Sequence, residues 1–235
     1  MYTHLPWDSK FFNFNIAKIE LEKKSANLFE TLFFLKKEGY TLVYGFSKVE
    51  INLNSKLLKK FSGKLVDRKI TYIKSVKDDV NSFYDSKIQK YEINKVNSNL
   101  LKLAIQSGEY SRFKLDKKIS RNKFEELYKH WLINSINKKI ADDVFIYSDN
   151  GVSGFITLAN KNKNTDIGLI AVEKQKRGKG IGKILMQSAE IWAAKNSFSK
   201  IQVVTQEANL KACNFYEKCN YSVYRKDFIY HFWLK

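Results

Sequence analysis

The sequence predicts an α/β (α+β) fold in which helices flank a mixed, largely antiparallel sheet. Three observations lead to this class. Short β-type runs alternate with helical stretches in the first half of the chain, an Asn-Gly turn joins two strands in the second half, and an apolar strand there precedes a glycine-rich loop and an amphipathic helix. With 235 residues, 44% of them hydrophobic, the chain is long enough to bury a full core.

The first half is expected to be a small α/β unit. Runs such as 41–44 and 69–73 have strand composition, and residues 27–37 have a helical pattern. A polar passage over residues 95–99 leads to residues 100–107, and residues 108–113 then read as a crossing between domains. We therefore predict an amino-terminal α/β domain over residues 1–105, which contributes to substrate binding, and a second domain over residues 106–235.

The second half begins with an amphipathic helix over residues 121–136, for which Ser120 is the expected N-cap. A hairpin follows, because Asn150-Gly151 favours the positive φ angles of a tight turn between two strands. The nearly continuous apolar run 167–172 predicts a central strand that is covered on both faces. These elements place a buried strand directly before the glycine-rich segment.

After that segment we expect a helix from Ile181, a strand over residues 201–205, and a short helix over 209–218 that Asn209 caps. Residues 221–233 are expected to supply two closing strands.

Composition excludes several classes of protein. Two cysteines, Cys213 and Cys219, are too few for a disulfide framework or a four-ligand zinc site, and we expect no metal. The first 15 residues lack a signal-peptide pattern and no segment reaches ~18 uninterrupted apolar residues, so we expect a soluble, cytoplasmic protein without membrane insertion. The net charge of +18 suits a phosphorylated ligand, nucleic acid or an acidic membrane, but base-composition bias explains it equally well.

The strongest chemical signal is the glycine loop, residues 173–183, which contains Arg177-Gly178-Lys179-Gly180-Ile181-Gly182 followed by Lys183. Glycines allow close backbone approach, successive N–H groups converge on one anion, and the following helix adds a positive dipole end. The spacing fits neither a P-loop, because Ile184 follows Lys183, nor a Rossmann fingerprint. A phosphate site is predicted, with a plain surface turn as the alternative.

The motif Arg177-x-x-Gly180-x-Gly182 resembles the Arg/Gln-x-x-Gly-x-Gly/Ala pattern of the GNAT superfamily of acyl-CoA-dependent N-acetyltransferases. Downstream, Asn209-x-x-Ala212-x-x-Phe215-Tyr216 is similar to a second motif of that superfamily. The resemblance covers residues ~115–235 and implies the GNAT fold, with the amino-terminal α/β unit as an addition. It also implies acetyl-CoA as co-substrate.

The resemblance implies roles for particular residues. The strand Ile170-Ala171-Val172 would lie beside the pantetheine, with its N–H groups near the thioester carbonyl, and residues 177–183 would bind the pyrophosphate. Tyr216 would be the general acid that protonates the leaving thiolate, and Asn209 would hold the pantetheine or a water. Core packing for Tyr216 and helix capping for Asn209 are the structural alternatives.

Short motifs in the first half, such as 5–12, and residues 111–113 and 204–206 resemble members of the superfamily that acetylate nucleotide-linked amino sugars. This narrower likeness implies a TDP- or UDP-linked amino-deoxysugar as acceptor, with Trp7, Asp8, Arg112 and Trp131 as substrate contacts. Solvated charge or core packing is the alternative for each of these four.

Other functions stay open at this stage. The same fold could acetylate a protein, a peptide or a small-molecule amine, and a homodimer is compatible with the sequence. A non-enzymatic nucleic-acid binder would also explain the charge, but no recognition motif supports it, and we expect no nucleic-acid partner.

Overall fold

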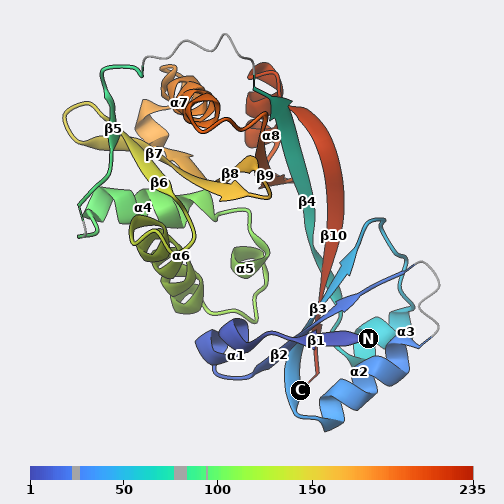
Figure 1. Ribbon diagram of the computed structural model, residues 1–235. Helices are drawn as coiled ribbons and strands as arrows, with labels where there is room; N and C mark the ends of the chain where they lie inside the picture. The colour runs from blue at the N-terminus through green and yellow to red at the C-terminus, as the bar shows by residue number, and fades with distance from the viewer. Residues whose placement is uncertain (23–26, 77–83, 94, 235) are drawn as a thin grey trace. The chain divides into compact units, whose positions relative to one another are not determined.

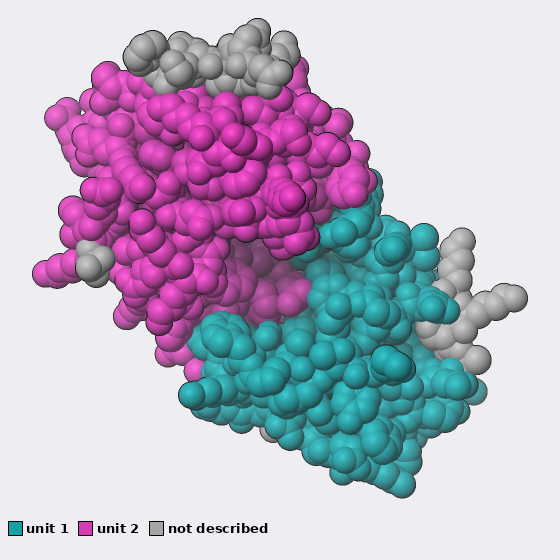
Figure 2. Space-filling model, viewed as in Figure 1, with its two compact units in different colours: residues 1–70, 206–208, 225–235 teal, residues 71–205, 209–224 magenta. Residues whose placement is uncertain are grey.

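The fold is taken from a computed structural model that describes residues 1–22, 27–76, 84–93 and 95–234. The chain divides into two compact units, which are coloured separately in Figure 2. Unit 1 contains residues 1–70, 206–208 and 225–235, and unit 2 contains residues 71–205 and 209–224. Strands β4 (Lys64–Ser75) and β10 (Ser222–Trp233) have residues in both units.

Among the described residues, the strands follow the order β1-β2-β3-β10-β4-β9-β8-β7-β6-β5. The pairs β1–β2, β3–β10, β5–β6, β6–β7 and β7–β8 are antiparallel, whereas β2–β3 and β8–β9 are parallel. The predicted fold class, a mixed and largely antiparallel sheet with flanking helices, is therefore confirmed.

Unit 1 consists of short elements around one apolar core. Besides its parts of β4 and β10, it contains β1 (Tyr2–His4), α1 (Pro6–Phe12), β2 (Asn15–Glu20), α2 (Leu28–Lys37), β3 (Tyr40–Ser47) and α3 (Ser55–Lys60). Helix α2 forms where the sequence repeats apolar residues at helical spacing, and its leucines Leu28, Leu32 and Leu35 are buried with Phe61 and Phe232. The helix therefore packs one face onto the strands.

Unit 2 carries the remaining strands and longer helices (Figure 1). Its elements are β5 (Ile88–Lys90), α4 (Ser98–Ser107), α5 (Arg112–Leu115), α6 (Arg121–Ile136), β6 (Asp143–Ser148), β7 (Val152–Lys161), β8 (Asn164–Val172), α7 (Ile181–Lys195), β9 (Lys200–Gln206) and α8 (Leu210–Lys218). Helix α4 packs against β7 and β8, α6 against α4 and β6, and α7 against β6, β7 and β8. Figure 1 shows α4 and α6 on one side of these strands and α7 on the other.

Local sequence signals account for most of unit 2. The side chain of Ser120 accepts a hydrogen bond from the N–H of Lys123 at the start of α6, as an N-cap does. The β6–β7 hairpin turns at Asn150 and Gly151, whose φ angles are 53° and 111°. The predicted helix over 121–136 and the predicted hairpin are both present.

One local prediction needs correction. Residues 222–233 form the single strand β10 instead of two closing strands, because no glycine, proline or asparagine interrupts this run. The described helices include none that is long and apolar enough to cross a membrane.

Candidate functional site

Strand β8 is paired with its neighbour β9 over only three residues. Registered pairs join residues 165–167 of β8 to residues 201–203 of β9, and no pair follows toward the end of β8 within the described residues. We call residues 168–172 the open edge of β8. Here Leu169 and Ala171 are buried, whereas Gly168 is exposed and Ile170 and Val172 are half-buried. The strand is central, as predicted, and both α4 and α7 pack against it. Its side chains nevertheless alternate between buried and half-buried or exposed, so only one face is fully buried and the prediction of two covered faces is not fully met.

The backbone of the open edge presents N–H groups away from β7. The N–H of Leu169 donates to Thr157 Oγ1 of β7 at 2.8 Å, and the N–H of Glu173 donates to the Ser153 carbonyl at 2.8 Å. Since successive residues of a strand alternate the direction of their polar groups, the N–H of Ile170 is directed to the opposite side, where β9 has parted from β8. An extended ligand backbone could pair with this edge.

The glycine loop follows β8 and ends at the start of α7. Gly178 and Gly180 have φ angles of 80° and 81°, and a Cβ built on either would meet no atom within 4 Å. Gly182 differs, because a Cβ there would lie 3.1 Å from the Phe215 ring of α8. Two glycines therefore shape an open backbone turn, while the third lets α7 approach α8 closely.

Two of the loop's basic side chains are engaged with the protein itself. Lys174 forms an ion pair with Glu109 at 2.9 Å, and Lys176 Nζ donates to Ser153 Oγ at 2.7 Å. These contacts fix the loop to the segment after α4 and to β7. Neither ammonium group is therefore fully available to an external anion.

The other three basic residues face solvent. Lys179 and Lys183 are exposed and make no ion pair with any residue that the structure describes. Arg177 is exposed too, but its Nε donates to the Val172 carbonyl at 3.1 Å. With the partnerless N–H groups that every helix start leaves, these side chains make the beginning of α7 a suitable anion site.

The carbonyl of Val172 has a second donor that sequence reasoning missed. Gln106 of α4 donates from Nε2 to this oxygen at 2.9 Å, across 66 residues of sequence. Gln106 belongs to no motif, so only a contact prediction between α4 and β8 could have found it.

Helix α8 holds the predicted catalytic pair. The side chain of Asn209 caps the helix by accepting from the Ala212 N–H at 3.3 Å, and its Nδ2 donates to Thr205 Oγ1 at 3.4 Å. Tyr216 is buried, and this burial raises the pKa of its hydroxyl above the usual value near 10. The phenol therefore keeps its proton throughout the physiological pH range.

The predicted substrate contacts fall into two groups. Arg112 and Trp131 of unit 2 meet through Phe113, since the Arg112 guanidinium carbon lies 4.5 Å from its ring centroid and Trp131 contacts it edge-on at 5.9 Å. Trp7 and Asp8 lie in α1 of unit 1, where Trp7 is 46% exposed and stacks on a neighbouring aromatic ring. In unit 2 the Phe113 ring is buried and Arg112 and Trp131 are half-buried, whereas in unit 1 the Trp7 ring is exposed beside the half-buried Asp8.

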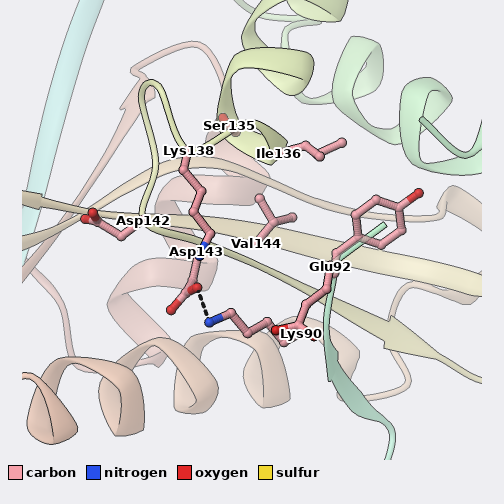
Figure 3. Close-up of a pocket in the computed structure, with 9 residues that line it drawn as sticks. Lys90, Glu92, Ser135, Ile136, Lys138, Asp142, Asp143 and Val144 are labelled. Carbon is pink, nitrogen blue, oxygen red and sulfur yellow. Dashed lines mark ion pairs between the residues drawn. The ribbon is translucent and has the colours of Figure 1, made fainter. Parts of the chain in front are cut away.

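A separate cavity of about 220 Å³ lies in unit 2 beside β5 and β6 (Figure 3). Lys90 and Asp143 form an ion pair across it at 2.6 Å, and Asp143 also accepts from Trp192 Nε1 at 2.7 Å. The paired carboxylate raises the pKa of Lys90. None of the predicted site residues lines this cavity, and both oxygens of Asp143 already have protein partners. The cavity is therefore not part of the candidate site.

Comparison with known proteins supports the acetyltransferase reading. Residues 109–221 match the model of the acetyltransferase (GNAT) family. The segment that matches this model, residues 109–221, is called the GNAT domain below. The structure is similar to that of a GCN5-related N-acetyltransferase from Sphaerobacter thermophilus, with a TM-score of 0.59 and 12% identity over 100% of this chain and 76% of the other. This likeness supports the fold of the GNAT domain.

Two curated relatives from Bacillus subtilis (strain 168) match parts of the chain. Streptothricin acetyltransferase A is 37% identical over 78 residues, which is 33% of this chain and 45% of that protein. The spore coat polysaccharide biosynthesis protein SpsD is 23% identical over 156 residues, 65% of this chain and 54% of the relative. The chain thus spans about half the length of the relatives it matches.

Two features of the GNAT domain could hold an extended ligand that carries a pyrophosphate. The open turn at Gly178 and Gly180, with Lys179 and Lys183 beside it, suits a pyrophosphate. The open edge of β8 suits the amide-containing pantetheine. The described residues contain no group of three or more His, Cys, Asp or Glu that could hold a metal ion.

Proposed function

We propose that the protein transfers an acetyl group from acetyl-CoA to the amino group of a nucleotide-linked (TDP or UDP) amino-deoxysugar, for the synthesis of a bacterial surface polysaccharide or glycan. One observation carries the acetyl-CoA half of the proposal. The open edge of β8 runs directly into a glycine loop that ends at the start of α7, within a GNAT domain. This combination offers a site for an extended amide chain followed by a site for its phosphates.

In this proposal, the glycine loop binds the pyrophosphate of acetyl-CoA. The positive φ angles of Gly178 and Gly180 leave the loop backbone open to the anion, and the N–H groups at the start of α7 donate to it. The exposed ammonium groups of Lys179 and Lys183 neutralise the remaining charge. The pantetheine runs along the open edge of β8 and brings the thioester toward Ile170.

The transfer is direct, without an acetylated protein intermediate. The neutral sugar amine attacks the thioester carbonyl, a C–N bond forms, and the C–S bond breaks to release CoA as its thiolate. The N–H of Ile170 donates to the oxyanion that develops in between. A chain of water molecules takes the proton that the amine loses.

Tyr216 is the proposed general acid for the departing sulfur. Its raised pKa keeps the hydroxyl protonated, so a proton is always present to donate. A thiol has a pKa near 8.5, which makes the phenol the weaker acid of the two. Tyr216 therefore stabilises the departing thiolate first by a hydrogen bond. When it gives its proton to the sulfur, the proton that the amine loses to water replaces it on the phenol, so that CoA leaves as the neutral thiol. Asn209 holds the start of α8 and the adjacent pantetheine or water.

For the acceptor, the support comes from one relative and from four residues. The name of SpsD places that relative in polysaccharide biosynthesis. Arg112, beside Phe113, offers a guanidinium to the sugar nucleotide's diphosphate, with Trp131 next to it. The exposed ring of Trp7 offers a stacking surface for base or sugar, and Asp8 a carboxylate. Residues 1–105 are proposed to contribute to this acceptor site.

A second candidate is a small-molecule amine that is not linked to a nucleotide. It is favoured by the 37% identity to streptothricin acetyltransferase A over 78 residues. Both candidates share the same donor chemistry and differ only in the acceptor.

The test measures release of CoA thiol from acetyl-CoA with a panel of acceptors. We expect turnover with TDP- or UDP-linked amino-deoxysugars, including TDP-4-amino-4,6-dideoxygalactose, and none with the same sugars after removal of the nucleotide. Turnover of streptothricin-like amines alone would establish the second candidate. Turnover of peptides alone would reject both.

A further inference from the structure

The Val172 carbonyl marks the point at which β8 ends and the glycine loop begins. It accepts two hydrogen bonds, from Gln106 Nε2 at 2.9 Å and from Arg177 Nε at 3.1 Å. A carbonyl oxygen has two lone pairs, so these donors use its full accepting capacity. A ligand amide could donate to this carbonyl only if the hydrogen bond from Gln106 or from Arg177 were broken.

The two donors come from different segments of the chain. Gln106 lies in the last turn of α4, a helix that packs against β7 and β8, whereas Arg177 lies in the glycine loop itself. A second link joins the same two segments, because Glu109, which follows α4, pairs with Lys174 of the loop at 2.9 Å. The end of α4 thus restrains both the start of the loop and the strand that precedes it.

We propose that Gln106 is a positioning residue for CoA binding. By holding the Val172 carbonyl together with Arg177, it fixes the direction of the peptide that joins the open edge of β8 to the glycine loop. This inference rests on the proposed function for its ligand, CoA, while the restraint itself belongs to the free protein. Gln106 makes no direct contact with the ligand and acts through the backbone.

This arrangement also assigns Arg177 a divided role. Its Nε is used on the Val172 carbonyl, so it can approach a phosphate only through its terminal Nη groups. Arg177 and Gln106 therefore hold the same peptide group. When one of them is removed, the other is the remaining side-chain donor that holds it in place.

The test uses Gln106→Met, which keeps the length and the neutral charge of the side chain and removes the donor. Gln89→Met is the matched control, because Gln89 is an exposed residue of β5 outside the site. We expect Gln106→Met to weaken CoA binding by up to about tenfold in calorimetry, because the hydrogen bond contributes about 0.5–1.5 kcal/mol to holding the loop in its binding conformation. KM for acetyl-CoA should rise with it, while kcat at saturating acetyl-CoA changes less than twofold. Gln89→Met should change neither.

A double-mutant cycle with Arg177→Lys, which keeps the charge and removes Nε, tests the shared carbonyl. We expect the two changes to be non-additive in CoA affinity. Strict additivity, or a fall in kcat without a change in KM, would overturn the positioning role.

Hydrogen exchange of the ligand-free protein separates this proposal from the proposed function. Gln106→Met should speed the exchange of backbone amides in residues 172–183 at least severalfold, and Gln89→Met should not. If the wild-type protein fails to bind CoA, the proposed function is rejected, and the exchange result still decides whether Gln106 holds the loop. Unchanged exchange in Gln106→Met rejects the positioning role.

Discussion

The substitution Gly180→Ala tests the anion site most directly. Gly180 has a φ angle of 81°, where an L-residue costs about 1–2 kcal/mol, and a Cβ there would meet no protein atom within 4 Å. The cost to the fold is therefore backbone strain alone. The Cβ would stand in the open turn where the proposed pyrophosphate binds.

Gly39→Ala is the control for this strain, because Gly39 has a φ angle of 79° and a Cβ there also meets nothing within 4 Å. Both variants should lose about 1–2 kcal/mol of stability, measured by urea unfolding. Only Gly180→Ala should also weaken CoA binding, because the methyl group displaces the phosphate from backbone N–H donors. Such charge-assisted bonds contribute about 1.5–3 kcal/mol, or roughly a 10- to 150-fold change in Kd.

Calorimetric titration with CoA provides the decisive measurement. A Kd for Gly180→Ala within twofold of the wild-type value would refute the anion site at this turn, whatever the change in stability. An equal loss of affinity in Gly39→Ala would show that strain, and not the position of the methyl group, is responsible.

Three further predictions follow. Tyr216→Phe should lower kcat at least tenfold with little change in the KM for acetyl-CoA. Tyr221→Phe, which removes another buried hydroxyl from the same cluster, should leave kcat unchanged. A kcat of Tyr216→Phe equal to that of the wild type would rule out the acid role. Burial and the Glu190 carboxylate raise the pKa of Tyr221, so the free energy of unfolding should fall as pH rises above about 10, and less steeply in Tyr221→Phe. Gly108→Ala would overlap the Tyr128 ring and should destabilise the protein by about 1–3 kcal/mol in urea unfolding.

Local features of the structure could be predicted from the sequence because their causes are local. Asn150-Gly151 encodes the hairpin turn, Ser120 caps α6, and the glycine loop carries its own backbone requirement. Asn209 caps α8 as its spacing indicated. The fold class followed from the order of these elements.

Features that depend on distant contacts could not be predicted. The apolar run 167–172 predicted a central strand, but it could not show that the backbone pairing with β9 ends at residue 167, because that depends on the course of residues 200–206. Strand β10 has residues in both compact units, so the two units cannot be separated by a single boundary in the sequence. The assignments of Trp7, Asp8, Arg112 and Trp131 to the acceptor site stay predictions.

The structure shows which of the basic residues behind the net charge of +18 are available near the glycine loop. Of the five basic residues near the glycine loop, Lys174 and Lys176 are tied to Glu109 and Ser153, and Arg177 is partly tied to Val172. In the proposed site, binding of CoA would therefore depend on Lys179, Lys183 and the backbone of the loop rather than on the total charge. Salt screens the attraction of the exposed Lys179 and Lys183 for CoA but leaves the hydrogen bonds from the loop backbone in place, so added salt should weaken CoA binding only in part. A steep dependence on salt would instead point to a diffuse attraction of anions to the whole basic surface.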